Sequence, residues 1–261
     1  MFRIAPMCAC ALLMISSTGT GRAAQGETTP GAAQKKTEAP GARARTGCDQ
    51  LPDAKQLTRL LREVPQQGEA GGFASGRFQW GAVVNRAGEL CAVAVATEDP
   101  AAAWPGSRGI AIAKASTANA FSTDTLPMST ARLYTLSQPG HSLWGADAGN
   151  PLNPACLGKP GDDAGIGKVC GGTIVFGGGL ALYSGNTRVG GLGISGDTAC
   201  ADHEIAKRVR HGAGLDPAKG QLADDIMYSK VDGPSVFTHP LCPNTWRNGQ
   251  KIGDEAASTG Y

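Results

Sequence analysis

The glycine-rich stretch at residues 171–197 constrains the fold of this chain more than any other part of the sequence. It reads GGTIVFGGGLALYSGNTRVGGLGISGD, in which short apolar runs alternate with turn residues. These runs predict three strands, at 173–176, 180–183 and 188–194. The three consecutive glycines at 177–179 offer no side chain for packing, so we expect a bulge there, or a bend where another group approaches the backbone.

Residues 191–196 also match the G-x-G-x-x-G pattern of dinucleotide-binding turns. That fingerprint requires a helix and then a second parallel strand, which ends in an acidic residue about 20 positions further on. A helix is predicted at 198–210 and Asp216 lies at a suitable distance, but no apolar strand follows His211. We therefore interpret the pattern as a glycine-containing strand end and not as a nucleotide site.

Apolar periodicity predicts the other elements of the folded part. Helical spacing is present at 51–64, 108–121 and 198–210, and residues 78–96 contain two apolar strands separated by a break at 85–88. Strand pairs joined by short turns, combined with helices that pack on them, predict an α+β fold with an antiparallel sheet.

The N-terminus has the pattern of a cleaved secretory signal peptide at residues 1–23. Arg3 precedes an apolar run, and small residues lead to a cleavage site after Ala23. The run, about a dozen residues, is too short to cross a bilayer, so a retained membrane anchor is the less favoured alternative. Residues 24–47 lack large apolar side chains and predict a disordered linker. We expect a periplasmic or secreted protein without a membrane span.

The charge balance argues against nucleic acid as a partner. The whole chain has 24 Lys and Arg against 22 Asp and Glu. Loss of the signal peptide would remove Arg3 and Arg22 but no acidic residue, which leaves the mature chain balanced. Binding to nucleic acid requires a basic field.

Cysteine usage predicts a disulfide framework. Outside the signal peptide six cysteines remain, an even number that in an exported chain allows three disulfides with 15 connectivities. Cys156 and Cys170 bracket a loop rich in Gly, Pro and Asp, and linking them would stabilise the fold by about 3 kcal/mol. A metal site is disfavoured, because no C-x-x-C occurs and no His lies near a Cys at zinc-finger spacing.

Three blocks of the sequence resemble one family. The segments GGTIVFGGGLAL, VGGLGISGD with the following Asp202, and KASTANAF at 114–121 resemble the GlcG/HbpS-like haem-binding proteins, whose domain is also called the haem-degrading domain. The resemblance covers about 51–215 and implies an antiparallel sheet of about five strands flanked by helices, in a homo-oligomer. We therefore assign 48–215 to a GlcG/HbpS-like domain and 216–261 to a C-terminal extension held by a disulfide.

The resemblance makes four residues candidates for binding haem. On the alanine-rich helix, Lys114 is a candidate partner for a haem propionate, Thr117 is a candidate weak oxygen ligand, and Phe121 lies in the same block. His141 lies on a loop beside Trp144 and is the candidate ligand for iron, because a neutral imidazole is the commonest protein donor to haem. Alternatively, the helix residues only pack on the sheet or on a second subunit.

The histidines outside the loop are less favoured as ligands. On the helix at 198–210, His203, Lys207 and Arg210 are predicted to face water, since the apolar residues of this helix mark another side. His239 precedes Cys242 in the extension and is expected to be held in place by a disulfide rather than to bind a ligand.

The family resemblance implies an exported protein that holds, buffers or senses haem or a related tetrapyrrole. We expect the glycine-rich sheet and the alanine-rich helix to form an apolar slot for the flat ring. Two alternatives stay open, which are a haem-degrading oxidoreductase and a structural or sensory accessory domain without a ligand. The sequence has no G-x-S-x-G elbow and no H-E-x-x-H motif, so a hydrolase is not expected.

Overall fold

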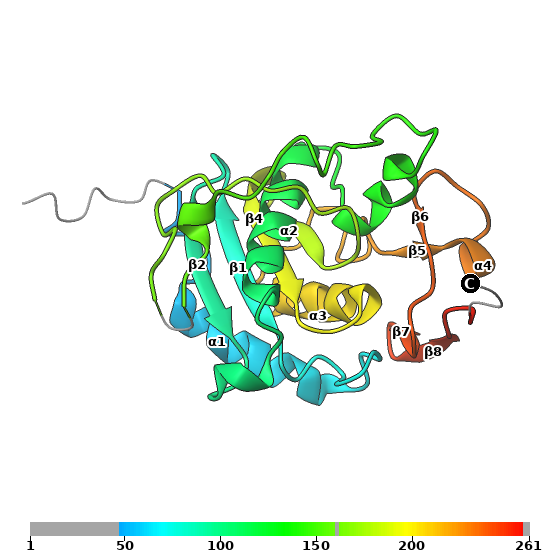
Figure 1. The fold of residues 1–261 in the computed structure, drawn as a ribbon, viewed down its shortest axis with the longest axis horizontal. Coiled ribbons are helices and arrows are strands. Elements are labelled where there is room, and N and C mark those ends of the chain that lie inside the picture. Colours follow the sequence, from blue (N-terminus) through cyan, green and yellow to red (C-terminus); the bar gives the residue numbers. More distant parts are fainter. Residues whose placement is uncertain (1–46, 160–161, 258–261) are drawn as a thin grey trace, which may run out of the picture. The chain divides into compact units, whose positions relative to one another are not determined.

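The computed structural model describes residues 47–159 and 162–257 (Figure 1). The predicted signal peptide and the predicted linker up to residue 46 lie outside the described residues. Within these ranges the helices are α1 (Ala54–Glu63), α2 (Ser107–Phe121), α3 (Ala199–Gly212) and α4 (Ser229–Asp232). The strands are β1 (Trp80–Asn85), β2 (Leu90–Val95), β3 (Gly179–Ser184), β4 (Thr187–Ser195), β5 (Met227–Tyr228), β6 (Thr238–His239), β7 (Thr245–Arg247) and β8 (Gln250–Gly253). No helix in these ranges is long and apolar enough to cross a bilayer.

The central sheet is antiparallel and confirms the predicted α+β class. Its strand order is β2-β1-β4-β3, so the two hairpins lie side by side with β1 against β4. Helix α2 covers one face, and α1 and α3 cover the other. This arrangement needs only short connections within each hairpin, whereas the crossing from β2 to β3 contains α2 and the long loop after it.

The sheet has four strands rather than about five, because the predicted strand at 173–176 is absent. These residues form no strand and lie outside the sheet. Gly172 has φ +84° and Gly178 has φ +116°, and these left-handed conformations turn the chain before and after the segment. The backbone N–H of Ile174 donates to Thr117 Oγ1 at 2.9 Å, which gives this amide a partner on α2 in place of a neighbouring strand.

Side chains of β1 alternate between two cores. Val83 packs in one cluster with Leu57 of α1 and Ile205 of α3, and its neighbour Ala82 packs in another with Ala111 of α2. All of these side chains are fully buried. Because successive side chains of a strand point to opposite faces, this apolar strand contributes to both cores.

Helix α2 lies directly on β4, and this contact requires glycine. A Cβ at Gly193 would collide with the carbonyl oxygen of Ala111, and one at Gly191 would collide with the carbonyl oxygen of Ala115. Figure 1 shows α2 lying across the sheet at this point. The apolar slot that we expected between sheet and helix is therefore not present, because backbone packs on backbone there and leaves no space for a flat ring.

The C-terminal extension covers the outer side of α3. Arg210 lies 2.7 Å from Asp224 (Nη2 to Oδ1), and Lys207 lies 2.9 Å from Asp225 (Nζ to Oδ1). Both basic side chains are buried. The prediction that they face water was wrong. The apolar periodicity of a helix does not show whether another segment of the chain packs on its polar side.

His203 is also buried, against the same prediction. Its Nε2 accepts the backbone N–H of Ile226 at 3.1 Å, and its side chain is 0% exposed. Burial lowers the pKa of His203, and the ring therefore carries no charge at neutral pH. The extension thus turns what would be the solvent side of α3 into a second, polar interior.

Three disulfides connect distant parts of the fold. Cys48 pairs with Cys91, Cys156 with Cys170, and Cys200 with Cys242. The second pair is the one favoured from the loop composition. The third joins α3 to the extension, 42 residues further along the chain, so the extension is held by a disulfide as expected.

Candidate functional site

A cavity of about 340 Å³ lies beside the C-terminal half of α2. Its wall combines that half of the helix, the β1–β2 turn, the start of β4 and the chain that precedes β3. The lining residues are Arg86, Ala87, Gly88, Ser116, Thr117, Asn119, Ala120, Phe121, Asn150, Val169, Gly171, Gly172, Thr173 and Arg188. A smaller cavity of about 180 Å³ shares three of these residues and continues along α2. The volume is at the lower end of the range for small-molecule sites, roughly 300–1,000 Å³.

Two arginines give this cavity a positive edge. Arg86 forms a bidentate pair with Asp124, at 2.9 Å from Nη1 to Oδ1 and 3.2 Å from Nη2 to Oδ2, and its Nη1 also donates to the carbonyl oxygen of Arg188 at 2.9 Å. The guanidinium of Arg188 donates through Nη1 to Asn119 Oδ1. Asp124 is therefore the acidic partner of both Arg86 and Arg188, and one positive charge is left to attract an anionic ligand.

Arg188 has a donor without a partner in the described structure. Its Nε is buried and forms no hydrogen bond. Burial lowers the pKa of Arg188, and the neighbouring charge of Arg86 lowers it further. A buried unsatisfied donor costs about 1–3 kcal/mol, and a carboxylate at this edge of the cavity would offset the charge of the guanidinium.

Of the four haem-binding candidates, the structure brings Thr117 and Phe121 together in the cavity wall. The hydroxyl of Thr117 is already in use, since it donates to the carbonyl oxygen of Ala113 at 2.7 Å and accepts the N–H of Ile174 at 2.9 Å. Phe121 is half-buried and contributes an aromatic surface. Thr117 therefore fixes the wall, whereas Phe121 is available to contact a ligand.

Lys114 lies apart from the cavity, inside the protein. Its Nζ is 2.6 Å from Asp202 Oδ2 and donates to the carbonyl oxygen of Ile194 at 2.9 Å, and the side chain is 0% exposed. Phe176 packs over the ammonium group, 4.9 Å from Nζ to the ring centroid. Burial lowers the pKa of Lys114 and raises the pKa of Asp202 to about 7. The observed partners of Lys114 are thus internal groups.

His141 is exposed and is not among the residues that line the cavity. Its backbone N–H donates to the carbonyl oxygen of Gln138 in a turn. Its role as an iron ligand stays a prediction.

Sequence reasoning missed Arg86 and Arg188. Arg86 lies in the turn of one hairpin, and Arg188, 102 residues later, is the second residue of β4 in the other. They become neighbours because Asn85 at the end of β1 pairs with Gly190 of β4. Each arginine lies next to a turn, which was a signal in the sequence, but only the strand order shows that the two turns meet.

The G-x-G-x-x-G pattern forms no phosphate site. Asp197 accepts the N–H of Phe73 at 2.7 Å and the N–H of Thr198 at 2.7 Å, and Thr198 caps α3 by accepting the N–H of Ala201. The amides that would hold a phosphate are therefore taken by side chains of this chain.

Acid should destabilise the fold through His239. Burial lowers the pKa of His239 to about 4, from 6.5 for an ordinary histidine. Between these values the unfolded chain binds a proton that the folded chain does not, so the free energy of unfolding falls as the pH falls. Between about pH 7 and about pH 4.5 this histidine should contribute a loss of about 2 kcal/mol, so urea unfolding curves of His239→Gln should show a loss smaller by about that amount than those of the wild type. Equal pH dependence of both proteins would contradict this assignment.

The comparisons with known proteins give one family. The model of the family described as "Haem degrading protein HbpS-like" matches residues 79–210. A crystal structure of a PduOC:heme complex is 26% identical, with a TM-score of 0.45, over 62% of this chain and 93% of that chain. The Klebsiella pneumoniae protein ORFY is 18% identical, with a TM-score of 0.44, over 70% and 98%. A double mutant of Streptomyces reticuli HbpS is 18% identical, with a TM-score of 0.37, over 71% and 97%. The comparison with curated proteins found no match.

Proposed function

The chain belongs to the HbpS-like family of haem-degrading proteins, and from this premise we propose that it is an exported protein that binds haem or a related tetrapyrrole in the cavity beside α2. The observation that carries the proposal is the unpartnered Nε of Arg188, next to a second guanidinium at the edge of a partly apolar cavity. Three disulfides support an oxidising compartment. Homo-oligomerisation and a role in buffering or sensing belong to the same proposal.

The lining residues fit the carboxylates and one face of a porphyrin better than they fit its iron. Arg188 and Arg86 would hold the propionates, and Phe121, Ala120 and Val169 would contact the ring. The lining includes no His, Cys, Met or Tyr. Haem would supply the iron. The arginines and apolar residues of the cavity would bind and orient the edge of the porphyrin and exclude water from one of its faces. A strong axial donor would come from outside this cavity, for which His141 remains the candidate.

A haemin titration of the oxidised mature protein tests the proposal. A saturable, sharpened Soret band is expected if haem is bound. Bleaching of that band after addition of reductant and oxygen would instead indicate the haem-degrading oxidoreductase, and an unchanged spectrum would favour an accessory domain without a ligand. Repeating the titration with His141→Ala locates the axial donor, because loss of a histidine ligand changes the position of the band.

Arg188→Ala should weaken haemin binding by about 10-fold to 100-fold, which corresponds to the loss of one charge-assisted hydrogen bond worth about 1.5–3 kcal/mol. The dissociation constant is read from the Soret titration at fixed ionic strength. Arg77→Ala is the matched control, since this arginine is exposed and does not line the cavity. Unchanged affinity in Arg188→Ala would remove the cavity from the proposal, even if haemin binds elsewhere.

A further inference from the structure

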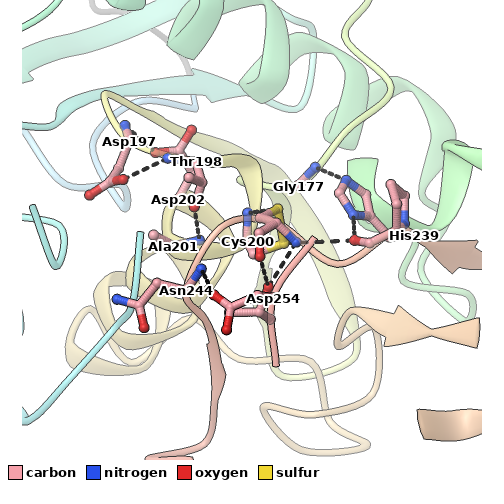
Figure 2. The surroundings of a disulfide bond; sticks show 12 residues. Gly177, Asp197, Thr198, Cys200, Ala201, Asp202, His239, Asn244 and Asp254 are labelled. Atoms are coloured by element: carbon pink, nitrogen blue, oxygen red, sulfur yellow. Dashed lines mark hydrogen bonds between the residues drawn. A yellow bond between two sulfur atoms is a disulfide. The ribbon is translucent and has the colours of Figure 1, made fainter. Parts of the chain in front are cut away.

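A buried group of three metal-binding side chains lies at the start of α3, away from the cavity. One ligand atom each of Cys200, His239 and Cys242 lies within 4.8 Å of the other two. A tetrahedral zinc ion, with Zn–S bonds of about 2.3 Å and Zn–N bonds of about 2.0 Å, places its ligand atoms roughly 3.5–3.8 Å apart. Figure 2 shows the disulfide between the two cysteines with His239 beside it. The two sulfur atoms are 2.01 Å apart in the disulfide, so they would have to separate on reduction to reach this spacing, whereas His239 already lies within reach of both.

The position on α3 favours the reduced form of this disulfide. Cys200 is the second residue of the 14-residue helix, where the free N–H groups and the helix dipole stabilise a thiolate. Its own backbone N–H donates to Cys242 Sγ at 3.2 Å. Both sulfur atoms would therefore gain stabilisation as thiolates, and a dithiol whose thiolates are stabilised forms a disulfide that is more easily reduced.

The hydrogen bonds of His239 fix the ring as a neutral donor. Its Nδ1 lies 2.7 Å from the carbonyl oxygen of Pro240, which only accepts, so Nδ1 carries the proton. Its Nε2 accepts the N–H of Gly177 at 3.3 Å. An imidazole held by a backbone carbonyl on one nitrogen, with a lone pair on the other, has the usual arrangement of a histidine ligand. A metal would replace only the long bond from Gly177.

We propose that reduction converts the Cys200–Cys242 disulfide into a zinc site, with the two thiolates and His239 Nε2 as ligands. An external dithiol transfers two electrons and two protons to the disulfide and itself becomes a disulfide. Zinc then binds, and the two thiols release their protons to solvent. No fourth His, Cys, Asp or Glu in the described part of the chain joins the group. The fourth position is therefore open to water or to a small ligand.

The test compares oxidised protein with protein reduced by a phosphine, with Co²⁺ as the probe. We expect the reduced protein to bind one equivalent of Co²⁺, with thiolate charge-transfer bands and the visible bands of tetrahedral cobalt, and to lose them when Zn²⁺ is added. The oxidised protein should bind no Co²⁺ at this site and should show none of these bands. His239→Ala should weaken the affinity for Co²⁺ by about 10-fold or more, with altered visible bands.

Cysteine variants separate this site from the other two disulfides. Cys200→Ser combined with Cys242→Ser should abolish the cobalt spectrum. Cys156→Ser combined with Cys170→Ser is the matched control and should bind like the reduced wild type. The proposal is overturned if the reduced wild type binds no Co²⁺, if it loses its near-UV circular dichroism on reduction, or if the first variant binds as well as the control. This inference does not depend on haem binding.

Discussion

Replacing Lys114 by alanine is expected to lower the free energy of unfolding by about 3–5 kcal/mol, the usual cost of breaking a buried ion pair by removing one partner. Lys114 and Asp202 are 0% and 2% exposed. The carboxylate of Asp202 also accepts the side-chain N–H of Gln79 at 3.0 Å and the backbone N–H of Asp197 at 2.9 Å. Without Lys114 it would keep these donors but lose its cation in a place that water does not reach.

Urea unfolding followed by circular dichroism measures this loss. Lys55→Ala, an exposed lysine on α1, is the control and should change the free energy of unfolding by about 0.5 kcal/mol or less. Adding Asp202→Asn to a Lys114→Met variant should recover much of the stability, because the uncompensated charge is then absent. A loss below about 1 kcal/mol for Lys114→Ala would contradict the structural role and reopen Lys114 as a haem partner.

Replacing Asp224 by alanine should have an effect of the same size, about 3–5 kcal/mol. Asp224 forms a bidentate pair with Arg210, at 2.7 Å to Nη2 and 2.9 Å to Nη1, and both side chains are 0% exposed. The same guanidinium donates to the carbonyl oxygens of Ala181 and Gln221, so it connects α3 to the sheet and to the extension. An arginine does not lose its proton in proteins, so the variant keeps the charge of Arg210, with the more distant Asp216, 3.4 Å from Nε to Oδ1, as its remaining acidic partner.

The control for Asp224→Ala is Glu98→Ala. Glu98 pairs with Arg62 at 3.4 Å, but the two side chains are 89% and 45% exposed, and such pairs contribute about 0–1 kcal/mol. Limited proteolysis gives a second measurement, since weaker attachment of residues 216–257 should expose this segment to cleavage. Equal stability of the two variants would show that the extension does not depend on the Arg210 pair.

The secondary structure was largely predictable because its signals are local. Helices expected at 51–64 and 108–121 are observed at Ala54–Glu63 and Ser107–Phe121. The hairpin expected within 78–96 is observed as β1 and β2. The prediction of a strand at 173–176 was wrong. A β-branched composition does not specify a partner strand, and the positive φ of Gly172 and Gly178 directs the segment away from the sheet.

The candidate sites were less predictable, because each depends on residues far apart in the chain. Lys114 and Asp202 are 88 residues apart, and Arg86 and Arg188 are 102 apart. Zinc-finger spacing does not include the group of Cys200, His239 and Cys242, because the two cysteines are 42 residues apart. A sequence pattern within one helix or strand does not predict contacts between residues so far apart in the chain.

By itself the sequence determined the α+β class, three helices and two hairpins, and it indicated the loop disulfide and the family, since all of these depend on residue types and spacing along the chain. Only the tertiary structure decided which polar side chains are buried and where a ligand has space. The glycines of β4 bring α2 into backbone contact with the sheet and close the expected slot, while the β1–β4 pairing opens a cavity at another place. The C-terminal extension covers α3, because Lys207 and Arg210 of this helix form ion pairs with Asp225 and Asp224 of the extension.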